Sequence, residues 1–392
     1  METVYDFDEV FPRRGTHATK WDAMPADDII PMWVADMDFR TFPGIIQALQ
    51  AQVAHGIFGY AAVPESYYRS VMRWFSNRHG WNGLHRDHFI VVPGVVPAIS
   101  AIVRALTLPG DKVIVQTPVY NCFFSSIRNQ GCQIEENRLV YADNTYTIDW
   151  DDFEQKCSDA RARIFILCNP HNPAGRVWTR QELQRMGEIC RRHHVFVIAD
   201  EIHGEIVMPG NRYLPYASID ETLADNCAVC VASTKAFNIA GLQIANIIVK
   251  NPDVRERIDR AVNIHEVCDV NPFGLIATEA AYTEDGAAWL DQLNRYIADN
   301  YACLKNDFAG RLPQFPVTKL EGTYLVWLNC AATGKPSQEI AAALLNDHRV
   351  WVNEGEMYGD PTNSFIRINI ACPRRILVEG LSRIADGLQK ML

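Results

Sequence analysis

The chain has 392 residues, of which 48% are hydrophobic and 21% charged, and its formal net charge is −10. This length exceeds what a single core usually serves, so we expect two lobes, each with a core of its own. The acidic balance argues against a nucleic-acid partner, which would need clustered Lys and Arg. Because no run of about 18 apolar residues occurs, we expect no membrane-spanning helix and no membrane partner.

Cysteine usage and the opening residues indicate where the protein resides. Residues 1–10 lack an apolar stretch, so we expect no signal peptide. The 11 cysteines are irregularly spaced, which favours free thiols in a reducing compartment, the cytoplasm. Cys227 and Cys230 are the one close pair, and a metal or redox site is the alternative interpretation. No second pair follows and the surrounding run is typical of a buried strand, so we expect no metal.

Short β-branched runs alternate with amphipathic stretches through the middle of the chain. This pattern predicts βαβ units, hence an α/β fold with a mostly parallel sheet flanked by helices. Strands are expected at 113–115, 163–168, 195–199, 228–232 and 244–249, with a helix at 181–193.

The last hundred or so residues follow a different pattern. Helices are expected at 289–304 and 375–392, and strands at 323–328 and 365–370, which together predict an α+β lobe. We expect the opening segment to lie against this lobe. The sequence therefore predicts a large domain at 45–285 and a smaller domain built from 1–44 and 286–392.

Three polar clusters each follow an apolar run, at 169–175, 200–203 and 233–235. In open α/β sheets, ligands bind at the carboxyl ends of the strands. We therefore expect the three clusters to converge on one crevice.

Lys235 is the first candidate for chemistry. It follows the apolar run 228–232, and a lysine at the end of a buried strand is partly desolvated. Desolvation lowers the pKa of the amine and frees it to bond an aldehyde. Considered alone, such a lysine more often extends its amine to the surface. The neighbouring clusters favour the functional interpretation.

Asp200, Asn172 and His203 are the polar residues expected near this lysine. Asp200 ends a buried run, and a pyridinium N–H is a suitable partner for a buried carboxylate. Asn172 lies in a rigid turn, from which its amide can donate to the phenolic oxygen of such a ring. His203 could reach the same oxygen. The alternatives are a helix cap or ion pair for Asp200, a plain turn for Asn172 and a core histidine for His203.

Three further features suit a phosphorylated ring and a carboxylate substrate. Gly94, Val95 and Val96 precede a helical stretch, so their amides can face a phosphate at a helix N-terminus. Tyr120 follows another strand and can stack on a flat ring. Arg367, on an alternating strand, can hold a carboxylate with two parallel bonds. The alternatives are an ordinary turn at Gly94, a core aromatic at Tyr120 and a surface salt bridge at Arg367.

The order of these elements resembles that of fold-type I pyridoxal-phosphate enzymes, the aspartate aminotransferase superfamily. Within it, the chain most resembles the MalY/PatB branch of cystathionine β-lyases, or C–S lyases. The segments that carry this resemblance are 33–39, 55–60, 200–203, 235–241 and 321–325.

The resemblance implies roles around a pyridoxal 5′-phosphate cofactor. Lys235 would bond its aldehyde, Asp200 would pair with the ring nitrogen, Asn172 would donate to the ring oxygen and Tyr120 would stack on the ring. Where aspartate aminotransferases have a tyrosine three residues after the aspartate, this chain has His203.

The resemblance also implies how substrate and a second subunit are used. Arg367 would hold the substrate carboxylate, helped by backbone near Val34. Tyr60 would reach the phosphate of the neighbouring subunit, which implies a homodimer with shared active sites.

Two positions depart from the wider superfamily near the phosphate. Gln243 stands where many aminotransferases carry an arginine, and Ala232 stands where a hydroxyl residue is common. The phosphate would then depend on backbone amides together with Ser233, Thr234 and Tyr60. The lyase branch also tends to lack that arginine.

The implied function is a lyase of amino-acid metabolism that cleaves a carbon–sulfur bond in cystathionine or a related cysteine S-conjugate. A thiol, pyruvate and ammonia would be the products. An aminotransferase is the first alternative, because it would use the same lysine. The second is a cofactor-binding regulatory protein that contacts a transcription factor, although no helix-turn-helix pattern is found.

Overall fold

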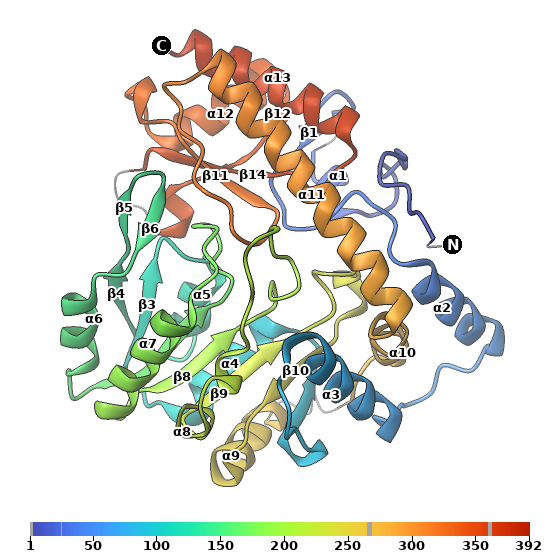
Figure 1. Cartoon of the computed structure of the whole chain (residues 1–392), viewed down its shortest axis with the longest axis vertical. Coiled ribbons are helices and arrows are strands. Elements are labelled where there is room, and N and C mark those ends of the chain that lie inside the picture. The colour runs from blue at the N-terminus through green and yellow to red at the C-terminus, as the bar shows by residue number, and fades with distance from the viewer. Residues whose placement is uncertain (1–2, 25, 265–268, 360–362) are drawn as a thin grey trace.

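The computed structural model contains one large sheet covered by helices, with a smaller part packed above it (Figure 1). The structure describes residues 3–24, 26–264, 269–359 and 363–392. The large sheet has seven strands in the order β2-β10-β9-β8-β7-β3-β4. Its strands are β2 (Phe89–Val92), β3 (Lys112–Thr117), β4 (Gln133–Arg138), β7 (Ala162–Cys168), β8 (Phe196–Asp200), β9 (Cys227–Val231) and β10 (Ala245–Ile248).

Alternate residues along the central strands enter two separate cores, one on each face of the sheet. On β7, Phe165 and Leu167 belong to one core, whereas Ile164 and Ile166 belong to the other. A strand buried on both faces has to be apolar throughout, which is why these runs contain almost no polar residue. The helices around the sheet are α2 (Pro43–His55), α3 (Glu65–His79), α4 (Val95–Leu106), α5 (Cys122–Arg128), α6 (Trp150–Cys157), α7 (Arg180–Arg192), α8 (Glu221–Ala224), α9 (Pro252–Asn263) and α10 (Pro272–Ala281).

The smaller part joins the two ends of the chain. Strand β1 (Ile30–Pro31) pairs in parallel with β12 (Val350–Trp351), so the opening segment lies beside the C-terminal elements (Figure 1). An antiparallel sheet of β11 (Leu325–Asn329), β14 (Phe365–Asn369) and β13 (Asn353–Glu354) is its centre. Its remaining elements are α1 (Thr19–Asp22), α11 (Glu284–Arg311), α12 (Ser337–His348) and α13 (Arg374–Lys390). The hairpin of β5 (Val140–Ala142) and β6 (Thr145–Thr147) follows β4 at the edge of the large sheet and extends toward the smaller part (Figure 1).

Short 3-10 turns complete the secondary structure, and one of them borders the pocket described below. They are η1 (Arg86–His88), η2 (Tyr216–Ser218), η3 (Ala240–Leu242), η4 (Ala331–Thr333) and η5 (Glu356–Tyr358).

The topology confirms the expected fold class, a mostly parallel sheet flanked by helices. The expected strands and the helix at 181–193 each overlap an observed element. One strand differs in direction, because β10 runs antiparallel to both β9 and β2. The domain boundaries at 44/45 and 285/286 remain a prediction. No helix among the described residues is long and apolar enough to cross a membrane.

Candidate active site

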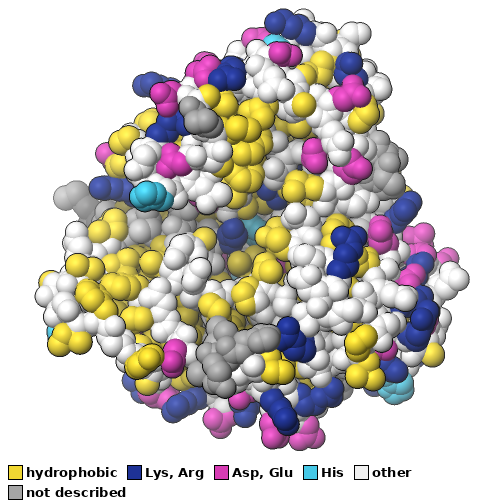
Figure 2. Space-filling model, turned by 180° about the vertical axis from the view of Figure 1, so that it is seen from behind, with side chains coloured by type: hydrophobic (Ala, Val, Ile, Leu, Met, Phe, Trp, Pro, Cys, Tyr) yellow, Lys and Arg dark blue, Asp and Glu magenta, His cyan; other side chains and the backbone are white. Residues whose placement is uncertain are grey.

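A pocket lies at the carboxyl ends of β7, β8 and β9, where the three polar clusters meet. Seen from the face opposite to that of Figure 1, the molecule is hollowed between its two parts, and basic and histidine side chains show in the hollow (Figure 2). The pocket is lined by Ala35, Pro93, Gly94, Val95, Val96, Pro97, Tyr120, Cys168, Asn172, Asp200, Ile202, His203, Thr234, Lys235, Ala240, Gln243 and Ile244.

The Lys235 amine lies inside this pocket, on the segment that follows β9. Its Nζ donates a hydrogen bond of 2.5 Å to the backbone carbonyl of Ala35. Burial lowers the pKa of the amine to about 8; the negative charges of Asp36 and Asp200 oppose this shift, whereas Arg367 adds to it. A fraction of Lys235 is therefore neutral near pH 7, as a nucleophile or a base has to be.

Asp200 ends β8 and is buried at the floor of the pocket. Its Oδ1 accepts one hydrogen bond, from the backbone N–H of Ile202 at 3.1 Å. Burial raises the pKa of this carboxyl to about 7, although the Ile202 N–H and the charge of Lys235 lower it. Buried carboxylates normally have several donors, so this one has room for a further N–H partner.

Asn172 and His203 flank the same space. The Asn172 Oδ1 accepts from Arg367 at 3.2 Å, which leaves its amide nitrogen free to donate into the pocket. His203 is buried, and its Nδ1 has no hydrogen-bond partner among the described residues. Burial, together with the charges of Lys235 and Arg367, lowers the pKa of His203 to about 3, so the ring is neutral.

The turn before α4 forms one end of the pocket. Gly94 precedes the helix, and no side chain caps the first N–H groups of α4. Uncapped amides at a helix N-terminus attract an anion such as phosphate. Thr234 and Gln243 also line the pocket, so a hydroxyl and a neutral amide occur here instead of an arginine.

Ser233 does not line the pocket, although we expected it beside the phosphate. Its hydroxyl is buried and lies 2.9 Å from the hydroxyl of Thr278, on α10. Of the two adjacent hydroxyl residues that follow β9, Thr234 alone borders the pocket.

Tyr120 lines the pocket, whereas Arg367 lies behind that lining and contacts it through Asn172. Burial raises the pKa of the Tyr120 hydroxyl, so the ring stays neutral. Arg367 is buried on β14, where one of its terminal nitrogens donates to the carbonyl of Trp33 at 2.7 Å. The Nε of Arg367 is buried and has no partner among the described residues. The Val34 carbonyl accepts from Asn369 at 2.6 Å, which fixes the backbone opposite this arginine.

Tyr60 does not reach the pocket of its own chain. Its side chain is 95% exposed, in the segment between α2 and α3. Ile57 and Phe58, in the same segment, are also largely exposed.

The sequence pattern did not identify three groups near the lysine: the Ala35 carbonyl, Asp36 and Tyr324. The Tyr324 hydroxyl donates to the Ala35 carbonyl at 3.1 Å, beside the Lys235 amine. The two aspartates of segment 33–39, which is otherwise apolar, were the available signal. Every cysteine that the structure describes is a free thiol, including buried Cys227 and Cys230 on β9.

The model of the aminotransferase class I and II family matches residues 27–384, and the chain belongs to this family. The chain is 39% identical to cystathionine β-lyase PatB of Bacillus subtilis over 98% of this chain and 100% of that protein. It is 30% identical to protein MalY of Escherichia coli over 98% of this chain and 99% of that protein. The resemblance to the MalY/PatB branch is therefore confirmed.

Solved structures agree with this placement. Cystalysin of Treponema denticola, whose crystal contains pyridoxal 5′-phosphate, superposes with a TM-score of 0.96 at 35% identity, with both chains fully covered. The pyridoxal-phosphate-bound C–S lyase of Staphylococcus hominis has a TM-score of 0.92 at 31% identity, covering 98% of each chain. Both share the mixed, mostly parallel sheet described above.

Proposed function

We propose that this protein is a pyridoxal-phosphate-dependent carbon–sulfur β-lyase that acts on cystathionine or a related cysteine S-conjugate. The products would be a thiol, pyruvate and ammonia. The observation that carries the proposal is the pairing of a partly neutral lysine, Lys235, with an incompletely bonded buried carboxylate, Asp200, in one pocket. The relatives named as cystathionine β-lyases and C–S lyases support the same class of reaction.

The pocket suits the cofactor at both of its ends. Asp200 would pair with the ring N–H, Asn172 and His203 would face the ring oxygen, and Tyr120 would stack on the ring. The amides that begin α4, with Thr234, would hold the phosphate. Pyridoxal phosphate would be bonded to Lys235 until the amine of the substrate displaces that lysine, and it would then draw electrons away from the substrate Cα and so acidify its proton.

The chain's own groups would then bind the substrate and move its proton. Arg367 would hold the carboxylate through the face that carries its unpartnered Nε, aided by backbone near Val34. The neutral amine of Lys235 would take the Cα proton. The Cα electron pair would form a double bond to Cβ as the Cβ–S bond breaks and the thiolate leaves. Addition of water to the remaining three-carbon fragment gives pyruvate and ammonia.

Two subunits would complete each site in this proposal. Tyr60 would contact the phosphate in the partner's pocket, which fits its exposure here and the apolar residues beside it. Mixing Tyr60→Ala and Lys235→Ala chains tests this idea, because only a mixed dimer would contain an intact site. Roughly a quarter of wild-type activity should return if sites are shared, and none if each site is built by one chain.

The remaining proposals concern domains and location. Pairing of β1 with β12 supports a small domain of 1–44 and 286–392 beside a large domain of 45–285. The irregular, unpaired cysteines support a reducing compartment, the cytoplasm.

One incubation tests the reaction class. The cofactor-loaded protein should convert cystathionine, without any keto acid, into equal amounts of thiol, pyruvate and ammonia. A strict requirement for a keto acid would contradict lysis and identify an aminotransferase. Turnover too slow to measure, with capture of a transcription factor, would favour a regulatory role.

A matched variant tests the lysine. Borohydride reduction should join the cofactor covalently to the peptide that contains Lys235, as read by mass spectrometry. Lys235→Ala should not form this adduct, and its rate of pyruvate release should fall at least about 10³-fold. An adduct on another lysine would overturn the assignment.

A further inference from the structure

Residues 33–39, here termed the strap, bring a backbone carbonyl to the catalytic lysine from far away in the sequence. The carbonyl of Ala35 accepts from Lys235 Nζ at 2.5 Å and from the Tyr324 hydroxyl at 3.1 Å. A segment without a helix or strand of its own would not hold this carbonyl in place unless other groups fixed it.

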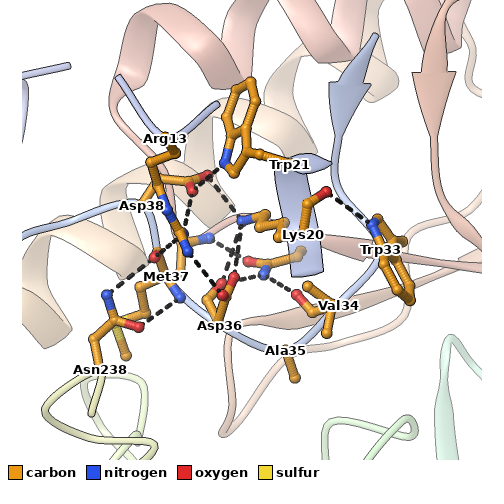
Figure 3. A network of polar contacts seen from close by, with 12 residues as sticks. Arg13, Lys20, Trp21, Trp33, Val34, Ala35, Asp36, Met37, Asp38 and Asn238 are labelled. Atoms are coloured by element: carbon orange, nitrogen blue, oxygen red, sulfur yellow. Dashed lines mark hydrogen bonds and ion pairs between the residues drawn. The ribbon is translucent and has the colours of Figure 1, made fainter. Parts of the chain in front are cut away.

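A partly buried network of charges fixes the strap (Figure 3). Arg13 donates to the carbonyl of Met37 at 2.8 Å, and Lys20 donates to the carbonyl of Asp36 at 3.2 Å. From the other side, Asn238 donates to the Met37 carbonyl and accepts from the Met37 N–H, each at 3.0 Å. Because Asn238 is three residues after Lys235, the strap and the lysine segment are tied together directly.

The two aspartates of the strap differ in how completely they are bonded. Asp38 accepts from Arg13 and Trp21 on one oxygen and from Lys20 on the other, all at 2.8 Å. Asp36 accepts from Arg13 at 3.1 Å through Oδ2 only. Its Oδ1 is buried and has no hydrogen bond among the described residues, and Lys20 lies 3.7 Å away as an ion pair. One carboxylate is therefore saturated and the other is not.

Asp36 is also the strap residue that directly follows Ala35, whose carbonyl accepts from the Lys235 amine. Apart from burial, which lowers the pKa of the Lys235 amine, the Asp36 charge has the largest effect, and it raises that pKa. Arg367 lowers the pKa, whereas Asp200 and Cys122 raise it more weakly.

Two further titratable groups face the lysine, and both are uncharged. His203 is neutral because its pKa lies near 3. Burial and the Asp36 charge raise the pKa of Tyr324, so its hydroxyl keeps its proton.

We propose that Asp36 is a positioning residue: it fixes the Ala35 carbonyl as the resting place of the free Lys235 amine and stabilises that amine after it has taken the Cα proton. The inference rests on the proposed role of Lys235 as the base. The proton moves from Cα to Nζ, and the new ammonium keeps its hydrogen bond to Ala35, whose neighbour Asp36 carries an oxygen that accepts no hydrogen bond among the described residues. The distinct task of Asp38 is to hold the strap.

Asp36→Asn tests this assignment in the cofactor-loaded enzyme. Loss of the negative charge makes Lys235 a weaker base, so the acid limb of the kcat–pH profile should move about 0.5–1 unit toward lower pH. The plateau of kcat should fall several-fold, while KM changes less. Asp36→Glu should return the acid limb most of the way to its wild-type pH, because it restores the negative charge.

Asp38→Asn is the matched control, since Asp38 shares Arg13 and Lys20 with Asp36. It should lower the melting temperature but leave the acid limb in place. If it does not fold, Trp21→Phe, which removes one bond to Asp38, replaces it. An acid limb that stays unmoved in Asp36→Asn, or that moves equally in the control, would overturn the proposal.

A second readout does not depend on turnover. In the full-length chain freed of cofactor, the pH dependence of Lys235 acetylation, followed by mass spectrometry, reports the pKa of its amine. Asp36→Asn should lower the midpoint by a similar amount, and an unchanged midpoint would contradict the inference. Absence of pyruvate release by the wild type would instead refute the proposed function and leave this midpoint as the test of Asp36.

Discussion

Two carboxylates five residues apart are both buried, yet their surroundings are opposite. Glu205 accepts from Trp74 Nε1 at 2.7 Å and from Arg78 Nε at 2.8 Å, and it lies 2.7 Å from His79 Nε2. Asp200, at the start of the same loop, accepts one backbone N–H. The sequence provides α3 as the partner of the first carboxylate and leaves the second facing the pocket.

The difference appears directly in the two pKa values. Burial raises the pKa of Glu205, but His79 and Arg78 with the Trp74 hydrogen bond more than reverse this effect and lower it to about 2. Burial raises the pKa of Asp200 to about 7, since little opposes it. A buried carboxylate with its partners inside the chain holds the fold together, whereas one without them is suited to a ligand.

Glu205→Gln should have the larger effect on stability. It leaves Arg78 and His79 without their buried counter-charge, and breaking such a pair typically costs about 3–5 kcal/mol. We expect the lower end, because Arg78 keeps Asp291 at 2.6 Å. The stabilising effect of Glu205 is fully present above the pH at which it titrates when unfolded and disappears as the pH falls toward 2. The difference in the free energy of unfolding between wild type and variant, measured in urea, should therefore be smaller at pH 3 than at pH 7. The kcat per folded molecule should be retained.

Asp200→Asn should have the opposite outcome. With cofactor bound, kcat should fall roughly 10²–10³-fold, because an amide cannot stabilise a protonated ring nitrogen as a carboxylate does. In the cofactor-free chain, the folded carboxyl holds a proton that the unfolded chain releases, so Asp200 destabilises the fold increasingly from about pH 4 to pH 7. In the wild type, the free energy of unfolding, measured in urea, should fall as the pH rises through this range. In the variant it should fall less steeply. A steeper slope would contradict the assignment.

The central sheet could be predicted because buried parallel strands are apolar without interruption, and such runs alternate here with amphipathic helices. The direction of β10 could not be predicted in this way. Its run is as apolar as that of β9, and burial on both faces dictates the same composition for either direction.

The same reasoning explains which site residues were found. Asp200 ends a strand of the large sheet, and Lys235 and Asn172 follow two others, so topology alone brings the three together. Asp36 lies on a segment without regular structure, about 200 residues from the lysine in sequence, and no local pattern predicts that approach. The different surroundings of Ser233 and Thr234 depend on the conformation of a single turn, which composition does not reveal.

Arg367→Lys sharpens the comparison on the substrate side. A lysine cannot form two parallel bonds to a carboxylate, and it would leave the Trp33 carbonyl and Asn172 Oδ1 with one donor at most. We expect kcat/KM for cystathionine to fall roughly 10–100-fold, mainly through KM. Arg383→Lys on α13, a helix whose residues are not among those that line the pocket, is the control and should leave both constants unchanged. A fall in kcat alone would mean that Arg367 acts on the transition state instead.

The smallest effects should separate two adjacent hydroxyls. Thr234→Ala removes a hydroxyl from the pocket wall and should weaken cofactor binding about 5–10-fold, the loss of one hydrogen bond of about 1 kcal/mol. Ser233→Ala instead removes the hydrogen bond between the Ser233 and Thr278 hydroxyls and should lower the free energy of unfolding by about 1 kcal/mol. Titrating the cofactor by absorbance and unfolding each variant in urea separate the two outcomes. If Ser233→Ala weakened cofactor binding as much as Thr234→Ala, the turn after β9 would have to present both hydroxyls to the phosphate, as the family resemblance implies.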